Sequence, residues 1–452
     1  MTSKSNSGDL KKWLNRIYIL LNIMMCLMVF SYFTVSENIN ITRGVKIILR
    51  LGMIGGSWLM YRYLLYKGHP PSFKHEHKIA AFFYLLYLFW GLMSVTWSTK
   101  WSYSLLQFIM TSTSVIFVWF FWKILRILQQ TYGEIRHFRY SAILSNGIHW
   151  IVLAFNIGAI VAPDIFYRLT HGGTIARLGG YLMNPNELGM MGVVGMGGAM
   201  LELRYSNKKK TLWWIILNGV ISLLLTGSRS TLIGFFLVAF YFIYNSDLKV
   251  VKYLIYAAAV FVVPVAVQMI FLKGDDGLDE VLSMTGRLPF WTALLTEAFP
   301  KEPLFGYGFM RIYYTDAFQG LNTYPGKMTH NTFIQVLMNL GFVGFFTVVM
   351  QMMFTVRAYV KSVSVDEKTI FVATGIPIFI NSLTEFGIFG ETNFGILFYQ
   401  LLIGMFLVKY NHKMNLKYKL MQRRLKRRLA KMSRDFDFVE GKLVSVVHEK
   451  GD

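Results

Sequence analysis

The sequence predicts an all-α membrane protein, a bundle of about twelve transmembrane helices with one long loop on its outer face. Apolar residues make up 54% of the 452 residues and charged residues only 15%, a composition typical of a polytopic membrane protein. Apolar runs of roughly 17 to 25 residues, long enough to cross about 30 Å of hydrocarbon, recur along the chain. Each run is predicted to be helical, because unpaired backbone groups are very costly in lipid.

The predicted spans follow one another along the first 410 residues. They are residues 15–34, 47–66, 78–97, 103–123, 143–163, 187–204, 211–227, 230–246, 251–272, 331–356, 368–386 and 393–410. The seventh and eighth spans meet at a very short turn. The longest polar connection, residues 273–329, separates the ninth span from the tenth. Residues 1–410 therefore form the predicted bundle with its loop, and residues 411–452 form a basic tail.

Lys and Arg orient this bundle, since short cytoplasmic loops collect these residues. With the N-terminus inside, the inner connections are 67–77, 124–140, 204–210, 245–252 and 357–368, followed by the tail, and they hold most of the 46 Lys and Arg residues. Both termini are therefore predicted to be cytoplasmic. The net charge of the chain is +22, and the tail contains the basic run QRRLKRRLAKMSR. Such a run favours contact with anionic lipid headgroups over binding of a nucleic acid or a protein partner.

This orientation delivers polar residues from five segments to the outer face. The first segment joins the fifth and sixth spans and carries Arg168, His171 and Arg177, followed by the turn Asn184, Pro185, Asn186 and Glu187. The others are TGSRS at 226–230, the large loop with Arg287 and Tyr307, His330 with Asn331, and the last connection, flanked by Glu385 and Glu391. The default interpretation of Asn186 is a turn and helix cap, and that of Tyr307 is packing of the loop. Binding of a glycan or phosphate is the functional alternative for both. The acidic run from Asp275 to Glu280 lacks the spacing of a Ca²⁺ loop, so no metal site is predicted.

Two arginines on this face are candidates for a phosphate clamp. Arg229 can be a lone arginine that reaches lipid phosphate, but Gly227, Ser228 and Ser230 around it favour close backbone approach and an anion site. Arg287 follows Gly286 in a stretch that fits an amphipathic helix. Alone it would be a surface arginine. As a second fixed cation it favours recognition of phosphate oxygens.

His330 is the candidate general base. The alternative is a purely structural role, in which His330 lies at the helix end with its hydrogen bonds made within the protein and Thr329 as the N-cap. A histidine at a helix start tends to stay neutral, because the positive end of the helix dipole disfavours imidazolium, and a neutral ring is what a general base needs.

Five short motifs in order carry a family resemblance. They are MNPNELG at 183–189, TGSRS at 226–230, GRLPFW at 286–291, PLFGYGF at 303–309 and HNTFIQ at 330–335. Together they resemble the O-antigen ligase and O-antigen polymerase superfamily over roughly residues 175–350. One departure is Asn339, nine residues after His330, where such sequences often carry Glu.

The resemblance implies a metal-independent glycosyltransferase without a cofactor in the bacterial cytoplasmic (inner) membrane, active on the extracytoplasmic side. The donor would be a glycan on undecaprenyl pyrophosphate. Arg229 and Arg287 match the arginines that hold the pyrophosphate, and His330 matches the histidine that activates the acceptor hydroxyl. The acceptor is a lipid A core sugar in ligases and another lipid-linked unit in polymerases, and the residues do not distinguish the two. A chain-length regulator is a possible partner of the basic tail.

A transporter is the alternative function class. Twelve helices with both ends inside also describe lipid-linked glycan flippases and other secondary transporters. Such proteins usually show a twofold repeat and polar or broken helices near the midplane. The sequence shows neither pattern, which favours the enzyme.

Overall fold

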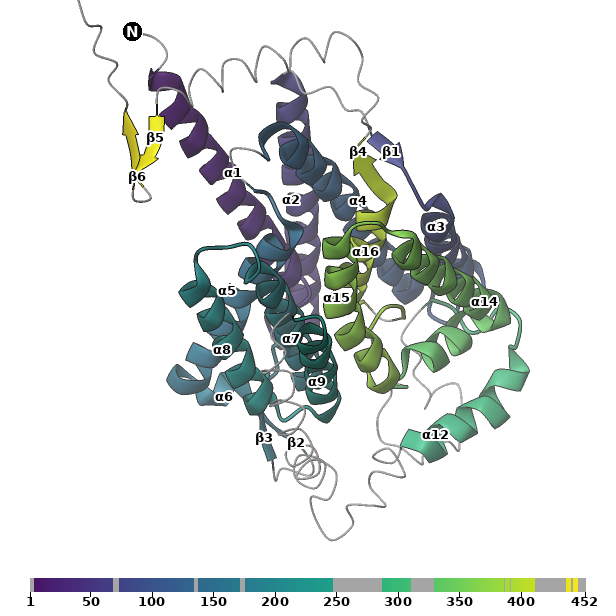
Figure 1. Cartoon of the computed structure of the whole chain (residues 1–452). Coiled ribbons are helices and arrows are strands. Elements are labelled where there is room, and N and C mark those ends of the chain that lie inside the picture. The colour runs from purple at the N-terminus through teal and green to yellow at the C-terminus, as the bar shows by residue number, and fades with distance from the viewer. Residues whose placement is uncertain are drawn as a thin grey trace, which may run out of the picture.

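The computed structural model of the chain describes residues 4–67, 73–133, 137–170, 175–246, 287–309, 329–385, 387–390, 392–410, 436–439 and 442–445. Figure 1 shows a bundle of helices with short strands at its two ends. The long helices are α1 (Lys4–Phe30), α2 (Ile39–Tyr66), α3 (Lys78–Met93), α4 (Trp101–Tyr132), α5 (Tyr140–Val161), α7 (Pro185–Glu202), α8 (Lys209–Thr226), α9 (Arg229–Tyr244), α14 (Thr332–Lys361), α15 (Val365–Thr384) and α16 (Phe394–Leu407). The short ones are η1 (Ser94–Thr96), α6 (Pro163–Phe166), α12 (Arg287–Ala293), η2 (Leu294–Ala298) and η3 (Phe299–Lys301).

The described helices lie where the spans were predicted. Every predicted span outside 251–272 overlaps a long helix, but 15–34 extends beyond the end of α1 at Phe30, and 393–410 extends beyond the end of α16 at Leu407 into a short strand. Five of the described helices, α1, α3 with η1, α4, α5 and α14, are long and apolar enough to cross a membrane. The chain is thus an all-α membrane protein by length and composition. The ninth span (251–272), the larger part of the loop 273–329 and most of the tail lie outside the described residues, so the count of twelve helices stays a prediction.

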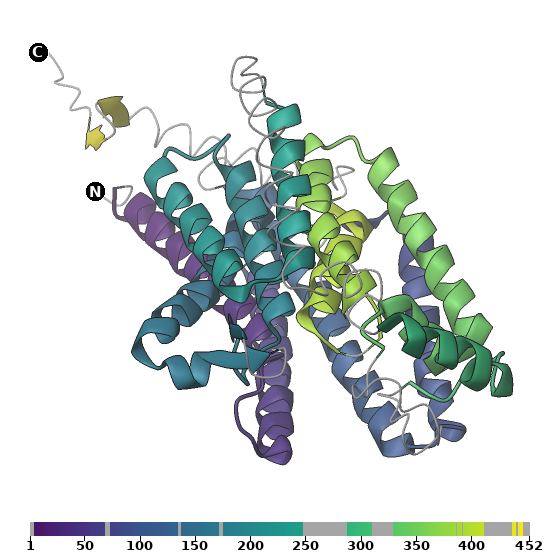
Figure 2. The same ribbon diagram turned by 90° about the horizontal axis from the view of Figure 1, so that it is seen from below.

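Helices α15 and α16 hold the two sides of the bundle together. On one side α15 packs against α7 and α9, and on the other α16 packs against α3 and α4 while α14 contacts both α3 and α15. The view in Figure 2 shows α15 and α16, in yellow-green, between the teal helices and the green and blue ones. Helix α7 approaches its neighbours closely at two glycines, which have no Cβ. A Cβ at Gly195 would come within 3.0 Å of Ile148, and one at Gly197 would come within 3.0 Å of Ala373.

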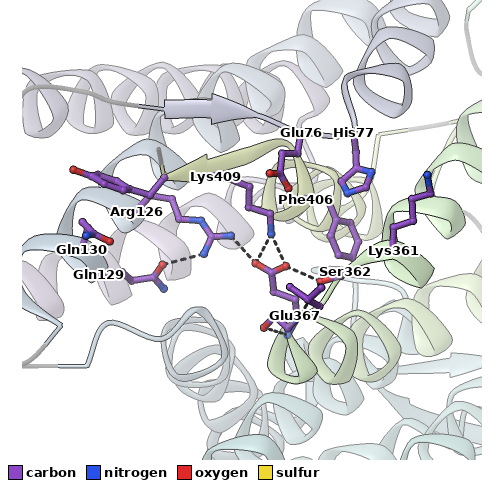
Figure 3. Close-up of a pocket in the computed structure, with 13 residues that line it drawn as sticks. Glu76, His77, Arg126, Gln129, Gln130, Lys361, Ser362, Glu367, Phe406 and Lys409 are labelled. Carbon is purple, nitrogen blue, oxygen red and sulfur yellow. Dashed lines mark hydrogen bonds and ion pairs between the residues drawn. The ribbon is translucent and has the colours of Figure 1, made fainter. Parts of the chain in front are cut away.

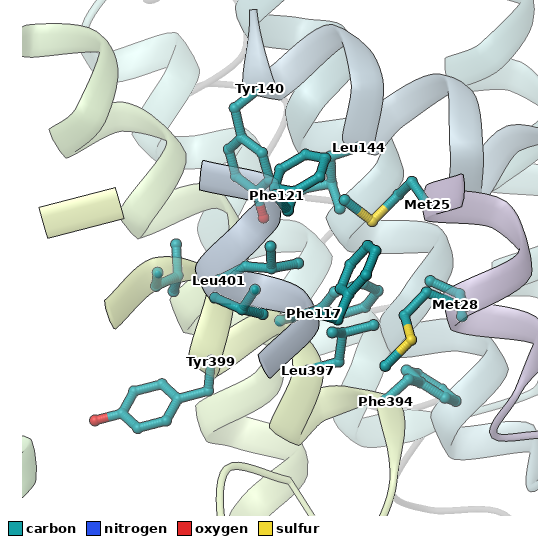
Figure 4. Close-up of a cluster of buried hydrophobic side chains, with 14 of the residues drawn as sticks. Met25, Met28, Phe117, Phe121, Tyr140, Leu144, Phe394, Leu397, Tyr399 and Leu401 are labelled. Carbon is teal, nitrogen blue, oxygen red and sulfur yellow. The ribbon is translucent and has the colours of Figure 1, made fainter. Parts of the chain in front are cut away.

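The main core is built from α1, α4, α5 and α16. Figure 4 shows Met25 and Met28 of α1 with Phe117 and Phe121 of α4 against the α16 residues Phe394 and Leu397. Aromatic rings pack together within this core, and the Phe117 and Phe121 rings stack with centroids 5.7 Å apart. The core ties the first and last helices of the chain together.

Short antiparallel strand pairs mark the two ends of the bundle, and the sequence did not predict them. At one end β1 (Phe73–His75) pairs with β4 (Val408–Tyr410), and at the other β2 (Tyr167–Thr170) pairs with β3 (Ile175–Leu178). A third pair, β5 (Phe436–Val439) with β6 (Lys442–Ser445), belongs to the tail. Figure 1 shows β2, β3 and α12 at the end opposite β1 and β4.

A break in α14 is filled by the PLFGYGF segment. Gly341 has non-helical angles (φ 61°, ψ −160°) inside α14, which leaves backbone groups on both sides of it without helical partners. The amides of Tyr307 and Gly308 donate to the carbonyls of Met338 and Asn339 at 2.9 Å. In return, the amides of Phe342 and Val343 donate to the carbonyls of Pro303 and Leu304 at 2.8 and 3.2 Å. The segment thereby provides hydrogen-bond partners for backbone groups at the break in the helix, which lipid could not provide.

A polar cavity of about 560 Å³ lies at the β1·β4 end. In Figure 3 its cations Arg126 and Lys409 converge on the carboxylate of Glu367. The Arg126 Nη2 atom lies 2.8 Å from Glu367 Oε1. Burial opposes the charge of Glu367, but Lys409 and Arg126 outweigh it and lower the pKa of its carboxyl. These pairs clamp α4, α15 and β4 together at the end far from the predicted site residues.

Candidate functional site

The carboxylate of Glu385, just beyond the end of α15, joins two of the predicted site residues. Its Oε2 lies 2.6 Å from Nδ1 of His330, and its Oε1 lies 3.0 Å from Nη2 of Arg287. Asn186 Nδ2 donates a third hydrogen bond to this carboxylate, at Oε1 and 2.8 Å. The Glu385 side chain is 5% exposed, whereas that of His330 is 18% exposed. A ligand can therefore reach the imidazole while the carboxylate stays behind it.

His330 precedes α14 and is not part of it. The expectation that Thr329 caps this helix is wrong, because the cap is Asn331, whose Oδ1 accepts from the amides of Phe333 and Ile334 at 2.9 and 3.1 Å. His330 itself has φ 48°, a left-handed conformation that is uncommon for a residue other than glycine. Such strain persists only where the surroundings hold it, and it is enriched at functional sites.

The GRLPFW segment holds the backbone next to His330. Trp291 Nε1 donates to the carbonyl of Thr329 at 2.6 Å. The ring of Trp291 packs with Phe290 and Leu294 on Met338 of α14, which fixes α12 against the broken helix. Arg287, at the first turn of α12, thereby reaches both Glu385 and the carbonyl of Thr384.

A bridge of polar groups connects this cluster to α7, α8 and the β2·β3 pair. Arg177 of β3 donates from Nη2 to Asn186 Oδ1 at 2.7 Å, and from Nε to the carbonyl of Thr226 at 2.7 Å. Asn186, in the first turn of α7, passes the connection on to Glu385. Arg168 lies directly opposite Arg177 in the strand register, so the hairpin presents two arginines side by side.

Arg229 is half-buried at the first position of α9. The turn before it is tight, with Gly227 at φ 57°, and a Cβ at that glycine would lie 3.9 Å from Arg177 Nε. The turn that precedes Arg229 therefore lies next to the Arg177 side chain.

The electrostatics of Arg177 indicate a concentration of positive charge. Burial, followed by the positive charges of Arg168, Arg229 and Arg287, lowers the pKa of Arg177 to about 10, with Glu385 acting in the opposite direction. For Glu385, burial favours the neutral acid, but His330 and Arg287, with the hydrogen bonds from His330 and Asn186, prevail and lower its pKa to about 2. Arg168, Arg229 and Arg287 thus act together on Arg177, and an anion would relieve the mutual repulsion of these arginines.

Three predicted substrate-binding residues have structural contacts here. Ser228 is the N-cap of α9 and its hydroxyl accepts from the Thr231 amide at 3.4 Å. Asn331 caps α14 and also donates from Nδ2 to the Leu383 carbonyl at 3.2 Å. The Tyr307 hydroxyl donates to the Ala298 carbonyl at 2.7 Å, consistent with its default role in packing the loop. His171 and Glu391 lie outside the described residues.

Glu385 received no role from the sequence, although it ends a predicted span on the outer face. The sequence did place Glu385 on the same predicted face as Arg287 and His330, which was a signal for a shared site. The order of these residues along the chain does not indicate that their side chains meet. Asn339, where the resemblance suggested a missing carboxylate, instead accepts from Gln335 Nε2 at 2.8 Å. Glu385 supplies a carboxylate from a different helix.

Residues 212–349 match the family model described as O-antigen ligase. No curated protein matches the chain. The matched residues run from α8 into α14 and include Arg229, Arg287 and His330. The match confirms over these residues the resemblance that the motifs indicated, and the long apolar helices indicate a membrane protein whose residues 212–349 are similar to O-antigen ligases.

Proposed function

We propose that the protein is a membrane-embedded glycosyltransferase that takes a glycan from undecaprenyl pyrophosphate on the outer face of the cytoplasmic membrane. The observation that carries the proposal is the shared carboxylate of Glu385, which holds His330 and Arg287 on one site with Asn186 and Arg177 behind it. The O-antigen ligase match supports glycosyl transfer as the reaction class.

His330 is the proposed general base. An ionised carboxylate only accepts hydrogen bonds, so at 2.6 Å from Glu385 the Nδ1 atom of His330 carries the proton. In the neutral ring, Nε2 then has a lone pair for the acceptor hydroxyl. When the ring takes that proton, the carboxylate stabilises the imidazolium, as in other His–carboxylate pairs.

The arginines are the proposed site for the pyrophosphate. The acceptor oxygen forms a bond to the anomeric carbon while the bond from that carbon to the phosphate oxygen breaks, and undecaprenyl pyrophosphate leaves with the electron pair. Cations fixed around the leaving group stabilise the negative charge that develops on it. Arg287 contributes an Nε that is buried without a hydrogen-bond partner among the described residues, a donor available to a phosphate oxygen.

Helix orientation supports an anion at this place. Helices α7 and α9 begin at Pro185 and Arg229, and α14 begins two residues after His330. Helix N-termini carry partial positive charge and favour bound anions. Attack by a base-activated hydroxyl on the face opposite the leaving group predicts inversion at the anomeric carbon.

The test is glycosyl transfer by the full-length protein in vesicles, with an undecaprenyl-pyrophosphate-linked glycan as donor and a lipid-linked glycan or a lipid A core as acceptor. Product would be followed by gel and mass spectrometry, with release of undecaprenyl pyrophosphate measured beside it. We expect His330→Ala to abolish transfer without changing movement of the lipid-linked glycan across the bilayer. Loss of that movement with the same variant would favour the flippase alternative, and the two acceptors distinguish polymerase from ligase.

A further inference from the structure

An apolar groove lies between α3, α4 and α16 towards the β1·β4 end of the bundle. Its volume is about 350 Å³, and its walls include Ile116 and Trp119 of α4 with Ile403 and Leu407 of α16. Two polar members of the lining bind each other, since Gln400 Nε2 donates to the Tyr84 hydroxyl at 2.8 Å. Helices α3 and α4 are both candidate membrane spans, so the groove faces hydrocarbon. Its natural occupant is a hydrocarbon chain.

A lysine stands at the β1·β4 end of this groove. Lys123 lies one helical turn beyond Trp119, with Nζ 4.2 Å from the centre of the indole ring and 5.6 Å from that of Phe73. None of the ion pairs among the described residues involves Lys123. A half-buried ammonium held on aromatic rings, without a carboxylate, is a site where an anion is favourable.

A histidine meets the same indole ring. His75 of β1 stacks on Trp119 with ring centroids 5.2 Å apart and pairs with Val408, which itself lines the groove. The Nε2 atom of His75 is buried and has no hydrogen-bond partner within the described part of the chain. Burial, followed by the positive charges of Lys123 and Lys78, lowers the pKa of His75. A bound anion would therefore meet two positive or proton-donating groups, Lys123 and His75, at the end of the apolar groove.

We propose that this groove binds one anionic phospholipid, with an acyl chain along Trp119 and Ile403 and the headgroup phosphate at Lys123 and His75. The charge complements a phosphate, the lining complements a chain, and Trp119 joins the two parts. Basic pockets between membrane helices are known to select anionic headgroups. The site lies at the opposite end of the bundle from Glu385, so it is distinct from the proposed reaction centre.

Native mass spectrometry of the full-length protein in detergent tests the proposal, with dioleoylphosphatidylglycerol and dioleoylphosphatidylcholine offered in equal amounts. We expect preferential retention of phosphatidylglycerol and about a fivefold loss of that preference in Lys123→Gln, the effect of one cation near a lipid phosphate. Lys67→Gln is the matched control, because Lys67 also lies on an aromatic ring, but that ring, Tyr63, is not among the residues that line the groove. The control is expected to behave as the wild type.

A second variant tests the chain. Ala81→Phe places a ring in the groove lining and is expected to reduce retention of both lipids while circular dichroism and thermal unfolding remain normal. Equal retention of the two lipids by the wild type, or equal losses in Lys123→Gln and Lys67→Gln, would overturn the proposal. So would binding of inorganic phosphate with the same Lys123 dependence and no effect of Ala81→Phe, because the site would then hold a free anion.

Discussion

Glu385 Oε2 lies 2.6 Å from Nδ1 of His330, although 55 positions separate the two residues in the chain. The same carboxylate receives Arg287 from a third element. A buried carboxylate shared by an imidazole and a guanidinium fixes the direction of both side chains. It also links the proposed base to the proposed anion site, so each depends on the other.

Replacing Glu385 by Gln tests this link. The amide keeps the size of the side chain but removes its charge, and its NH₂ group can donate to Nδ1 of His330. The proton would then sit on Nε2, the wrong position for a base. We expect a loss of about 10² to 10⁴ in transfer rate, the usual contribution of general-base catalysis. Glu385→Asp is the companion variant, and activity of Glu385→Gln near the wild-type level would disprove the pairing.

Substitutions at His330 separate proton transfer from positioning. Gln keeps a polar side chain of similar reach but cannot act as a base near neutral pH. If His330 transfers a proton, His330→Gln and His330→Ala lose activity equally, by about 10² to 10⁴. A His330→Gln protein much more active than His330→Ala would show that positioning alone matters. Rates would be measured on reconstituted protein with equal insertion.

The arginines are expected to matter individually. Arg229→Ala and Arg287→Ala should each slow transfer by about 10² to 10³, as for the loss of one donor to a developing charge. Arg43→Ala is a suitable control, because Arg43 lies near the start of α2 over the ring of Tyr103 and is not in the cluster. Activity should survive chelators if the arginines hold the pyrophosphate. Normal product from either cluster variant, or a strict need for a divalent ion, would contradict the clamp.

Acid should destabilise the protein through Glu385. Its pKa is lowered from the ordinary 4.5 to about 2 in the folded protein, so the ionised form contributes stability above about pH 4.5, and that contribution is lost as the pH falls towards 2. We expect thermal unfolding of the wild type to shift to lower temperature across this range more than that of Glu385→Gln. Equal decreases of the unfolding temperature of the two proteins with falling pH would show that the ionised carboxylate gains no stability from His330 and Arg287.

Trp291→Phe tests the support of His330. The variant keeps an aromatic ring in the cluster with Met338 but loses the 2.6 Å hydrogen bond to the Thr329 carbonyl. We expect about 1 kcal/mol less stability and a lower transfer rate, because the left-handed backbone of His330 is then held less firmly. Trp150→Phe, on an exposed tryptophan of α5, provides the comparison. An unchanged rate would assign Trp291 to packing alone.

The sequence by itself determined most of the helices and predicted three site residues. Apolar runs of membrane length fix helices because lipid leaves the backbone no other partner, and each described span overlaps a long helix. Arg229, Arg287 and His330 are predicted from short polar motifs between such runs. The PLFGYGF motif was visible as a turn, but its role in filling the break at Gly341 was not, because backbone pairing between distant segments leaves no pattern in the residues.

Only the tertiary structure decided which polar groups meet. Glu385 and Asn186 lie 199 positions apart and share a hydrogen bond, and the hairpin that presents Arg168 and Arg177 was not predicted because its strands are only four residues long. Hydrophobic periodicity records which side of a helix is buried. It does not record which helices become neighbours, and the electrostatics of a site depend on that neighbourhood.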